Sequence, residues 1–316
     1  MSNAKLATAL STLIAVTVVW AVPIAGTAHH LLRTDETAAV WSAGTPVLDP
    51  IPFKESKSRG LLVATWINGS GPYTFAIDTG AGVSLVSRNL VQRAGLQLQK
   101  SRQTLVGGLS SGVIASNQSV QIREVALGNR SNALRATFQA AVVPSLPAEL
   151  DGILDPTEVF KPLAYSIDLP QGQLRVFDLN GSAPRLSNAA QDGAVVKWIR
   201  QRGDHRPFVR LGDGRLALVD TGSGFGLAIS DSRSFGNHRD DARVTRDLGG
   251  GVVQSRRVAP VTVNIGPLVL RNIPTDLLSG AAAGTPLILG RDALYPFRIT
   301  FDPSGGLIAI EPSESR

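Results

Sequence analysis

Two copies of the tripeptide Asp-Thr-Gly are the part of this sequence whose residue types and spacing could carry out chemistry. They are Asp78-Thr79-Gly80 and Asp220-Thr221-Gly222, which lie 142 positions apart, and each follows an apolar segment. Two carboxyl groups held face to face cannot both ionise, so they share a proton, and one acts as a base while the other acts as an acid. Such a pair can activate a water molecule for attack on an amide carbonyl, without a metal or a covalent intermediate.

The threonine and the glycine of each copy suit the same chemistry. Thr79 and Thr221 can hold the two turns together by hydrogen bonds across an interface, and Gly80 and Gly222 can let backbone N–H groups approach the carboxyl groups. These four residues are therefore expected to support the two aspartates.

The residue after each tripeptide differs between the copies. Ser223 has a hydroxyl that could donate to Asp220 and lower its pKa by stabilising the charged form, whereas its counterpart Ala81 has none. We therefore expect Asp220 to be the ionised partner and Asp78 to hold the proton.

A longer internal repeat surrounds the two tripeptides. Residues 78–86 and 220–228 are identical at five of nine positions, and the same offset brings Gly107-Gly108 onto Gly249-Gly250. The order of the segments is kept and only the lengths of the loops change, which indicates a duplicated unit. The structural alternative is a duplicated β-unit in which each Asp-Thr-Gly is only a turn.

The repeat also predicts the domain organisation. We expect an N-terminal lobe at residues 59–178, a linker at 179–191 and a C-terminal lobe at 192–312. A monomer with internal pseudo-twofold symmetry then brings the two aspartates together, with a cleft between the lobes.

Strand patterns dominate both units. Residues 61–67 and 73–77 flank a turn at Asn68-Gly69, and residues 207–211 and 216–219 repeat this plan. Each aspartate should therefore end the second strand of a hairpin.

Helical patterns are scarce. The clearest are residues 88–94, which end at Gly95, and Asp155-Pro156-Thr157-Glu158, which has the order of an N-cap, a first-turn proline and a capping glutamate. The sequence therefore predicts an all-β protein of two lobes with few short helices.

The N-terminal segment predicts export. Lys5 precedes an uncharged apolar run at residues 6–28, which fits a signal peptide cleaved before His29. The run is also long enough to span a bilayer, so residues 1–28 could instead remain as a membrane anchor. Both alternatives place the body outside the cytoplasm, as a periplasmic or secreted protein or one tethered to the membrane. Residues 29–58 are expected to form an extended tether, a pro-segment or a strand added to the interface.

The composition excludes several other classes of site. The chain has no cysteine, which rules out thiol catalysis, cysteine-ligated zinc and iron–sulfur clusters. Its four histidines have no metal-ligand spacing, so we assign no metal and no cofactor. The net charge is +6, but the arginines are scattered and only 5% of residues are aromatic, which favours a solvated basic surface over a nucleic-acid interface.

These motifs resemble the aspartic proteases of the pepsin and retropepsin type. The segment Leu287-Ile288-Leu289-Gly290-Arg291-Asp292-Ala293-Leu294 is especially similar to the retroviral-type pattern at that turn, and the resemblance covers residues 59–312. It implies two retropepsin-like lobes in one chain of a bacterial-looking kind, with Asp78 and Asp220 as the catalytic pair.

The resemblance also implies roles for the hairpin tips. The tips at Gly107-Gly108 and Gly249-Gly250 would be flaps that cover a bound polypeptide substrate, and two glycine-rich tips indicate two flaps. Neither tip carries the flap tyrosine of pepsin-like enzymes, so we transfer no role to Leu109.

The first lobe departs from the pattern at one turn, because Asp155 stands where the second lobe has Gly290. We expect Asp155 to cap the following helix and to tolerate a left-handed backbone conformation. Aspartate in place of glycine would also be expected if the first lobe had changed towards a purely structural role.

The sequence thus predicts an exported aspartic endopeptidase that hydrolyses peptide bonds with water. One alternative is a catalytically inactive binding or scaffold protein that keeps the fold. Another is a membrane-tethered processing factor that cleaves a single partner.

Overall fold

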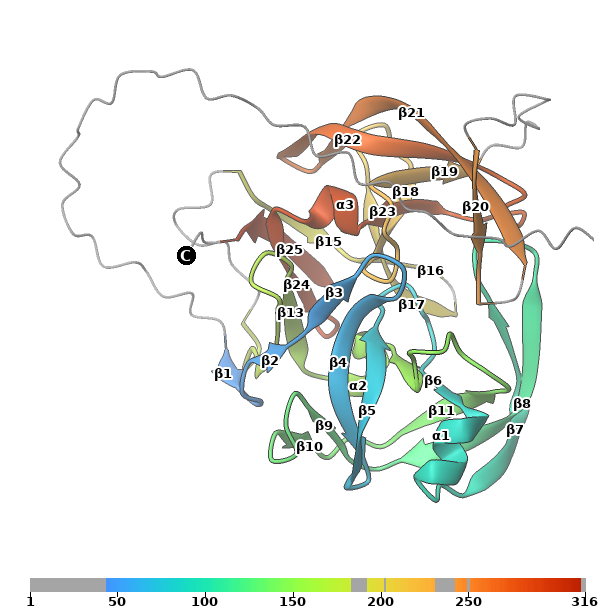
Figure 1. Cartoon of the computed structure of the whole chain (residues 1–316). Helices are drawn as coiled ribbons and strands as arrows, with labels where there is room; N and C mark the ends of the chain where they lie inside the picture. Colours follow the sequence, from blue (N-terminus) through green and yellow to red (C-terminus); the bar gives the residue numbers. More distant parts are fainter. Residues whose placement is uncertain (1–43, 183–191, 202, 231–241, 249–250, 314–316) are drawn as a thin grey trace, which may run out of the picture. The chain divides into compact units, whose positions relative to one another are not determined.

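The computed structural model describes residues 44–182, 192–201, 203–230, 242–248 and 251–313 (Figure 1). These residues fall in one compact unit. The predicted signal or anchor at 1–28, the start of the tether and most of the linker lie outside them. Within the described ranges the chain is mostly strand, with three short helices, so the predicted all-β class is confirmed.

The first lobe contains a ten-stranded sheet made only of residues 54–154. In spatial order its strands are β10 (Ala133–Leu134), β9 (Val125–Leu127), β4 (Gly60–Ile67), β5 (Ser70–Ile77), β12 (Gly152–Leu154), β6 (Leu85–Ser87), β11 (Phe138–Val143), β8 (Val113–Ile122) and β7 (Leu98–Gly107), and β3 (Lys54–Ser56) pairs with β4.

The second lobe contains an eight-stranded sheet. Its spatial order is β16 (Ile199–Gln201), β17 (Asp204–Arg210), β18 (Leu216–Asp220), β23 (Leu287–Gly290), β19 (Leu227–Ser230), β22 (Leu268–Ser279), β21 (Val252–Ile265) and β20 (Ala242–Arg246).

The two sheets repeat the same strand relations. The strand that leads to each aspartate, β5 or β18, pairs in parallel with β12 or β23. That partner pairs antiparallel with β6 or β19, which in turn pairs in parallel with β11 or β22. The sequence repeat therefore corresponds to a repeat of strand topology around the two aspartates.

A third sheet joins the two halves of the chain. Its spatial order is β1 (Thr45–Pro46), β14 (Gln173–Asp178), β13 (Ala164–Asp168), β24 (Phe297–Asp302), β25 (Leu307–Pro312) and β15 (Ala194–Lys197), and β2 (Ile51–Pro52) pairs with β14. The junction is the antiparallel pair β13–β24, where the rings of Tyr165 and Phe301 stack with their centroids 4.8 Å apart. Both side chains are fully buried, so this sheet links the lobes through a hydrophobic core.

Local turn chemistry explains the elements beside the site. The hairpin β4–β5 turns at Asn68 and Gly69, both with positive φ, as its sequence predicts. Helix α1 (Arg88–Arg93) is capped by the Ser87 hydroxyl, and Gly95 follows with φ of +62°. Helix α2 (Pro156–Phe160) begins after Asp155, and α3 (Arg291–Leu294) begins after Gly290.

The described part of the predicted tether is built into the sheets. Residues 44–58 include β1, β2 and β3, which pair with β14 or β4. The first-lobe sheet therefore begins at Lys54, before the predicted boundary at residue 59. Among the residues that the structure describes, no helix has the length and apolar character needed to cross a membrane.

Candidate active site

The structure brings the two Asp-Thr-Gly turns together at the junction of the lobes. Asp78 follows β5, and its backbone N–H donates to Leu154 O at 3.0 Å. Asp220 is the last residue of β18 and lies opposite Gly290 in the parallel ladder. Each aspartate is thus fixed by a neighbouring parallel strand of its own lobe, as the repeat of topology requires.

The glycines allow the two carboxyl groups to meet. A Cβ atom on Gly80 would lie 2.6 Å from Cγ of Asp220, and one on Gly222 would lie 2.4 Å from Cγ of Asp78. Each glycine N–H also donates to the aspartate of its own turn, at 2.8 Å for Gly80 and 2.9 Å for Gly222. Any side chain at either position would therefore displace the carboxyl group of the opposite lobe.

The threonines connect the two turns beneath the carboxyl groups. Thr79 N–H donates to Thr221 Oγ1 at 3.2 Å, and Thr221 N–H donates to Thr79 Oγ1 at 3.0 Å. The Thr79 hydroxyl also donates to Val219 O at 2.7 Å, whereas the Thr221 hydroxyl reaches Ile77 O at 3.5 Å. Both threonines are fully buried, so these bonds across the lobes are shielded from water.

The two carboxyl groups differ in their electrostatic surroundings. Burial raises the pKa of Asp78 well above its ordinary value, and the negative charge of Asp220 raises it further. Burial raises the pKa of Asp220 too, but hydrogen bonds from Asp78 and from the Ser223 and Gly222 N–H groups act against this. The environment therefore favours a proton on Asp78 and a negative charge on Asp220.

The sequence-based reason for this asymmetry was wrong in one respect. Ser223 supports Asp220 through its backbone N–H, which donates to Asp220 Oδ1 at 3.1 Å. Its hydroxyl instead accepts a hydrogen bond from Phe225 N at 3.3 Å. The donor that reaches the carboxylate is therefore a backbone N–H, which any residue except proline would supply at this position.

The turn at Asp155 also corrects an expectation. Asp155 caps α2, since its carboxylate accepts from Thr157 N at 2.9 Å, but its φ of −79° and ψ of 106° are extended rather than left-handed. Gly290 has no positive φ either. Glycine is needed at position 290 because a Cβ there would lie 2.4 Å from Phe225 O. The two turns therefore differ in how closely the neighbouring backbone approaches, and not in the sign of φ.

Arg291 anchors the second turn to the first lobe. Its side chain is 1% exposed and forms an ion pair with Glu55 at 3.0 Å. The same guanidinium donates to Thr221 O and Gly222 O, at 2.7 and 2.9 Å. Residue types within the second lobe alone do not identify these partners, so a supporting role for Arg291 could not be predicted from the sequence.

The hairpin tips of the two lobes contact each other. Ser110 N–H, at the tip between β7 and β8, donates to Asp247 Oδ2 at 2.6 Å, and Gly251 N–H donates to Asp247 Oδ1 at 3.2 Å. Leu109 O accepts from Ala282 N at 2.8 Å. Of the predicted flap residues, Gly107 ends β7 and Gly108 follows it, while Gly249 and Gly250 lie outside the described residues.

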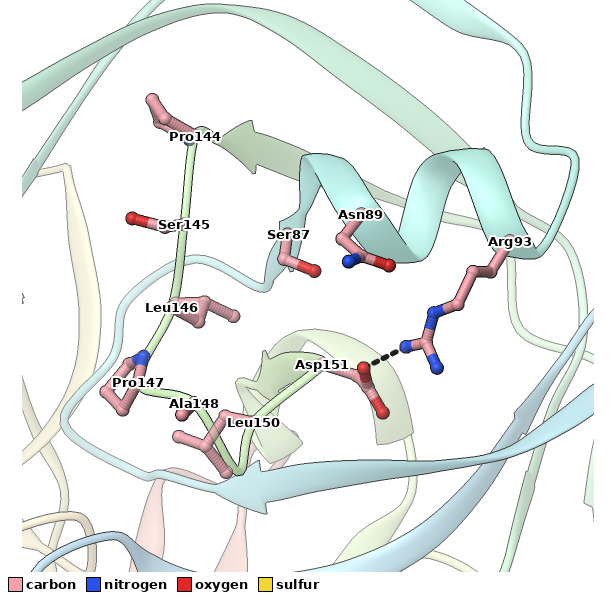
Figure 2. A pocket seen from close by; sticks show the side chains of 10 residues that line it. All are labelled: Ser87, Asn89, Arg93, Pro144, Ser145, Leu146, Pro147, Ala148, Leu150 and Asp151. Carbon is pink, nitrogen blue, oxygen red and sulfur yellow. Dashed lines mark hydrogen bonds and ion pairs between the residues drawn. The ribbon is translucent and has the colours of Figure 1, made fainter.

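A separate pocket of about 460 Å³ lies between α1 and the loop that precedes β12 (Figure 2). The Arg93 guanidinium and the Asp151 carboxylate form an ion pair at its edge. Neither Asp78 nor Asp220 lines it, so it is distinct from the paired aspartates. Its lining residues are Ser87, Asn89, Arg93, Pro144, Ser145, Leu146, Pro147, Ala148, Leu150 and Asp151.

The described residues contain no group of three or more His, Asp or Glu side chains that could hold a metal ion. The two aspartate carboxylates instead accept hydrogen bonds from the backbone N–H groups of Gly80, Gly222 and Ser223.

Part of the chain is similar to a known protein family. Residues 63–154 match the family model described as aspartyl protease. The matched segment runs from β4 to β12 and includes the Asp78 turn and the first hairpin tip. No curated protein matches the chain. The family match supports an aspartyl protease of the retropepsin type and a protease-type function.

Proposed function

We propose that this chain is an exported aspartic endopeptidase that hydrolyses polypeptides with a water molecule held between Asp78 and Asp220. The observation that carries the proposal is the approach of the two carboxyl groups, each so close to the opposite turn that only glycine fits there. Export is supported by the apolar run at residues 6–28 after Lys5.

Burial raises the pKa of both carboxyl groups, but hydrogen bonds oppose the rise at Asp220, which supports Asp220 as the base and Asp78 as the acid. The Asp220 carboxylate takes a proton from water, and the resulting hydroxide oxygen bonds to the carbonyl carbon of the substrate. Asp78 donates its proton to the carbonyl oxygen, which gives a neutral tetrahedral diol. The proton on Asp220 then passes to the amide nitrogen, Asp78 regains a proton from a diol hydroxyl, and the C–N bond breaks. Both carboxyl groups return to their initial state.

Apolar side chains near the dyad support a preference for apolar residues in the substrate. In the first lobe Val106 and Leu150 pack in one cluster with Ala81 and Val83, which follow the Asp78 turn. In the second lobe a separate cluster includes Phe225, which follows the Asp220 turn. We therefore expect cleavage between apolar residues, because their burial in such surroundings is favourable.

The test is digestion of a peptide library with product identification by mass spectrometry. The wild-type protein should cleave at acidic pH, and a statine-type inhibitor, which mimics the diol, should stop cleavage. The variant carrying both Asp78→Asn and Asp220→Asn should produce no fragments. Asp213→Asn is the matched control, because it removes an exposed aspartate that pairs with Arg215.

The binding or scaffold alternative predicts a different result. A folded wild-type protein that cleaves no peptide between pH 3 and 8 but still binds unstructured polypeptides would replace the endopeptidase with that alternative. Equal cleavage by the double variant would instead show that the dyad is not the site.

A further inference from the structure

An aspartate of the first lobe and a histidine of the second lobe meet close to the dyad. Asp155 is 1% exposed, and its Oδ2 atom lies 2.6 Å from Nε2 of His205 on β17. The His205 side chain is 45% exposed, so it can exchange protons with solvent. The contact therefore joins a buried carboxylate to a group that titrates near neutral pH.

Asp155 is connected to the catalytic turn through the backbone. The preceding residue, Leu154, accepts the hydrogen bond from Asp78 N–H at 3.0 Å. Asp155 N–H donates to the Ser84 hydroxyl at 3.2 Å, and Ser84 N–H donates to Glu158 at 3.1 Å. A shift of Asp155 would thus move both the strand that holds Asp78 and the segment that follows its turn.

A buried carboxylate needs a partner at this position. Its Oδ1 atom is used by the helix cap, which leaves Oδ2 to His205. If His205 is neutral, Asp155 keeps a hydrogen bond but no compensating charge, which is costly in a buried position. If His205 is protonated, both lobes are joined by a charge-assisted hydrogen bond.

We propose that His205 is a positioning residue for the dyad, and that in its protonated form it holds Asp155, and through it the Asp78 turn, against the second lobe. The inference rests on the proposed function for its effect on catalysis, although the contact itself can be tested without it. It predicts that protonation of His205 is needed for the most active arrangement of the dyad.

The surrounding charges favour this protonation. The hydrogen bond to Asp155 is the main reason that the pKa of His205 is raised, and the negative charges of Glu158 on α2 and Asp204 on β17 add to it. Asp204 itself forms an ion pair with Arg206 at 2.6 Å. The negative charge of Asp155 also raises the pKa of Asp78, in addition to the larger effects of burial and of Asp220.

Nuclear magnetic resonance of ¹³C-labelled histidine tests the contact directly in the purified protein. The His205 resonance is assigned by its loss in His205→Gln. Its pKa should be higher in the wild-type protein than in Asp155→Asn, which retains an acceptor for the helix cap but not the charge. An unchanged pKa would overturn the proposal.

Chemical unfolding provides a second readout. Because the pKa of His205 is raised on folding, its stabilisation is complete below the unfolded-state pKa and is lost as pH rises through the folded-state pKa. The free energy of unfolding should fall across that range in the wild-type protein and in the control Asp213→Asn, but not in His205→Gln. The same fall in His205→Gln would contradict the proposal.

The pH profile of kcat/KM separates positioning from simple stabilisation. His205→Gln should lower kcat/KM by about tenfold to 100-fold in folded protein, as expected for a misplaced catalytic group. His205→Arg, which stays charged, should restore activity and move the alkaline limb to higher pH. If the alkaline limb of the kcat/KM profile lies at the same pH in His205→Arg as in the wild-type protein, the positioning role of His205 is refuted. If the wild-type protein cleaves no peptide, the endopeptidase proposal is wrong. The resonance and unfolding measurements alone would then test the contact between His205 and Asp155.

Discussion

The Asp78 and Asp220 turns have the same tripeptide, but each is supported by a different residue of its own lobe, and that residue pairs with the opposite lobe. The Asp220 turn is held by Arg291, a buried and permanently charged group that also pairs with Glu55. The Asp78 turn is backed by Asp155, whose partner is the titratable His205. The residue that supports the Asp78 turn is thus acidic, whereas the residue that supports the Asp220 turn is basic.

This difference separates the two carboxyl groups electrostatically. Burial raises the pKa of both groups; the negative charge of Asp155 adds to this rise at Asp78, whereas the positive charge of Arg291 opposes it at Asp220. A symmetric pair would share its proton equally, whereas here the supports favour protonated Asp78 and ionised Asp220. Residues outside the repeated tripeptide therefore contribute to the difference between the two carboxyl groups.

Among the residues that support the dyad, the largest effect is expected from filling the space between the turns. Gly80→Ala and Gly222→Ala should each lower kcat/KM by about 100-fold or more, because the new Cβ would lie within 3 Å of the opposite carboxyl group. Peptide cleavage measures the loss, and circular dichroism measures folding. Asp213→Asn is the control, since it changes an exposed side chain that pairs with Arg215. Near wild-type activity in Gly80→Ala would contradict the close approach of the turns.

A large loss of stability is expected when Arg291, which supports the Asp220 turn, is replaced. Arg291→Gln should lower the free energy of unfolding by about 3–5 kcal/mol, because it leaves Glu55 and several buried carbonyl groups without a partner. Urea unfolding at pH 7 measures this loss. Arg215→Gln, which alters an exposed ion pair, should leave stability unchanged. If Arg291→Gln and Arg215→Gln had equal free energies of unfolding, Arg291 would not be a support of the Asp220 turn.

The threonines should reveal a smaller asymmetry. Thr79→Val and Thr221→Val should each cost about 1–3 kcal/mol, because each leaves a buried N–H of the opposite turn without an acceptor. Thr79→Val should cost more, since its hydroxyl also donates to Val219 O at 2.7 Å, whereas Thr221 Oγ1 lies 3.5 Å from Ile77 O. A greater loss in Thr221→Val, measured by urea unfolding, would contradict this order.

The smallest effect is expected at the residue after each tripeptide. Ser223→Ala should leave the acidic limb of the kcat/KM profile nearly in place, because the backbone N–H that reaches Asp220 is retained. Ala81→Ser serves as the reciprocal variant in the first lobe. A clear move of the limb to higher pH in Ser223→Ala would show that the hydroxyl, and not the backbone, stabilises the Asp220 carboxylate.

Local features of the fold could be predicted from the sequence because neighbouring residues determine them. The turn at Asn68-Gly69, the end of α1 at Gly95 and the cap of α2 by Asp155 all follow from turn and capping preferences. The repeat of the tripeptide also predicted that two turns share one topology. These features depend on short segments or on a comparison within the chain.

The supports of the dyad could not be predicted in the same way. Arg291 and Glu55 are 236 positions apart, and His205 and Asp155 are 50 apart, so only the folded chain reveals that they meet. Residue type was also insufficient for Ser223, because its hydroxyl and its backbone N–H are alternative donors and only geometry distinguishes them.

The most direct test of the dyad compares the single and double asparagine variants with one cleaved peptide. Asp78→Asn and Asp220→Asn should each lower kcat/KM by about 10³-fold or more, and the double variant should lose little beyond either one, because the two groups act as a unit. Circular dichroism and urea unfolding establish that each variant is folded. Cleavage at near wild-type rate in either folded single variant would show that the two aspartates do not form one catalytic site.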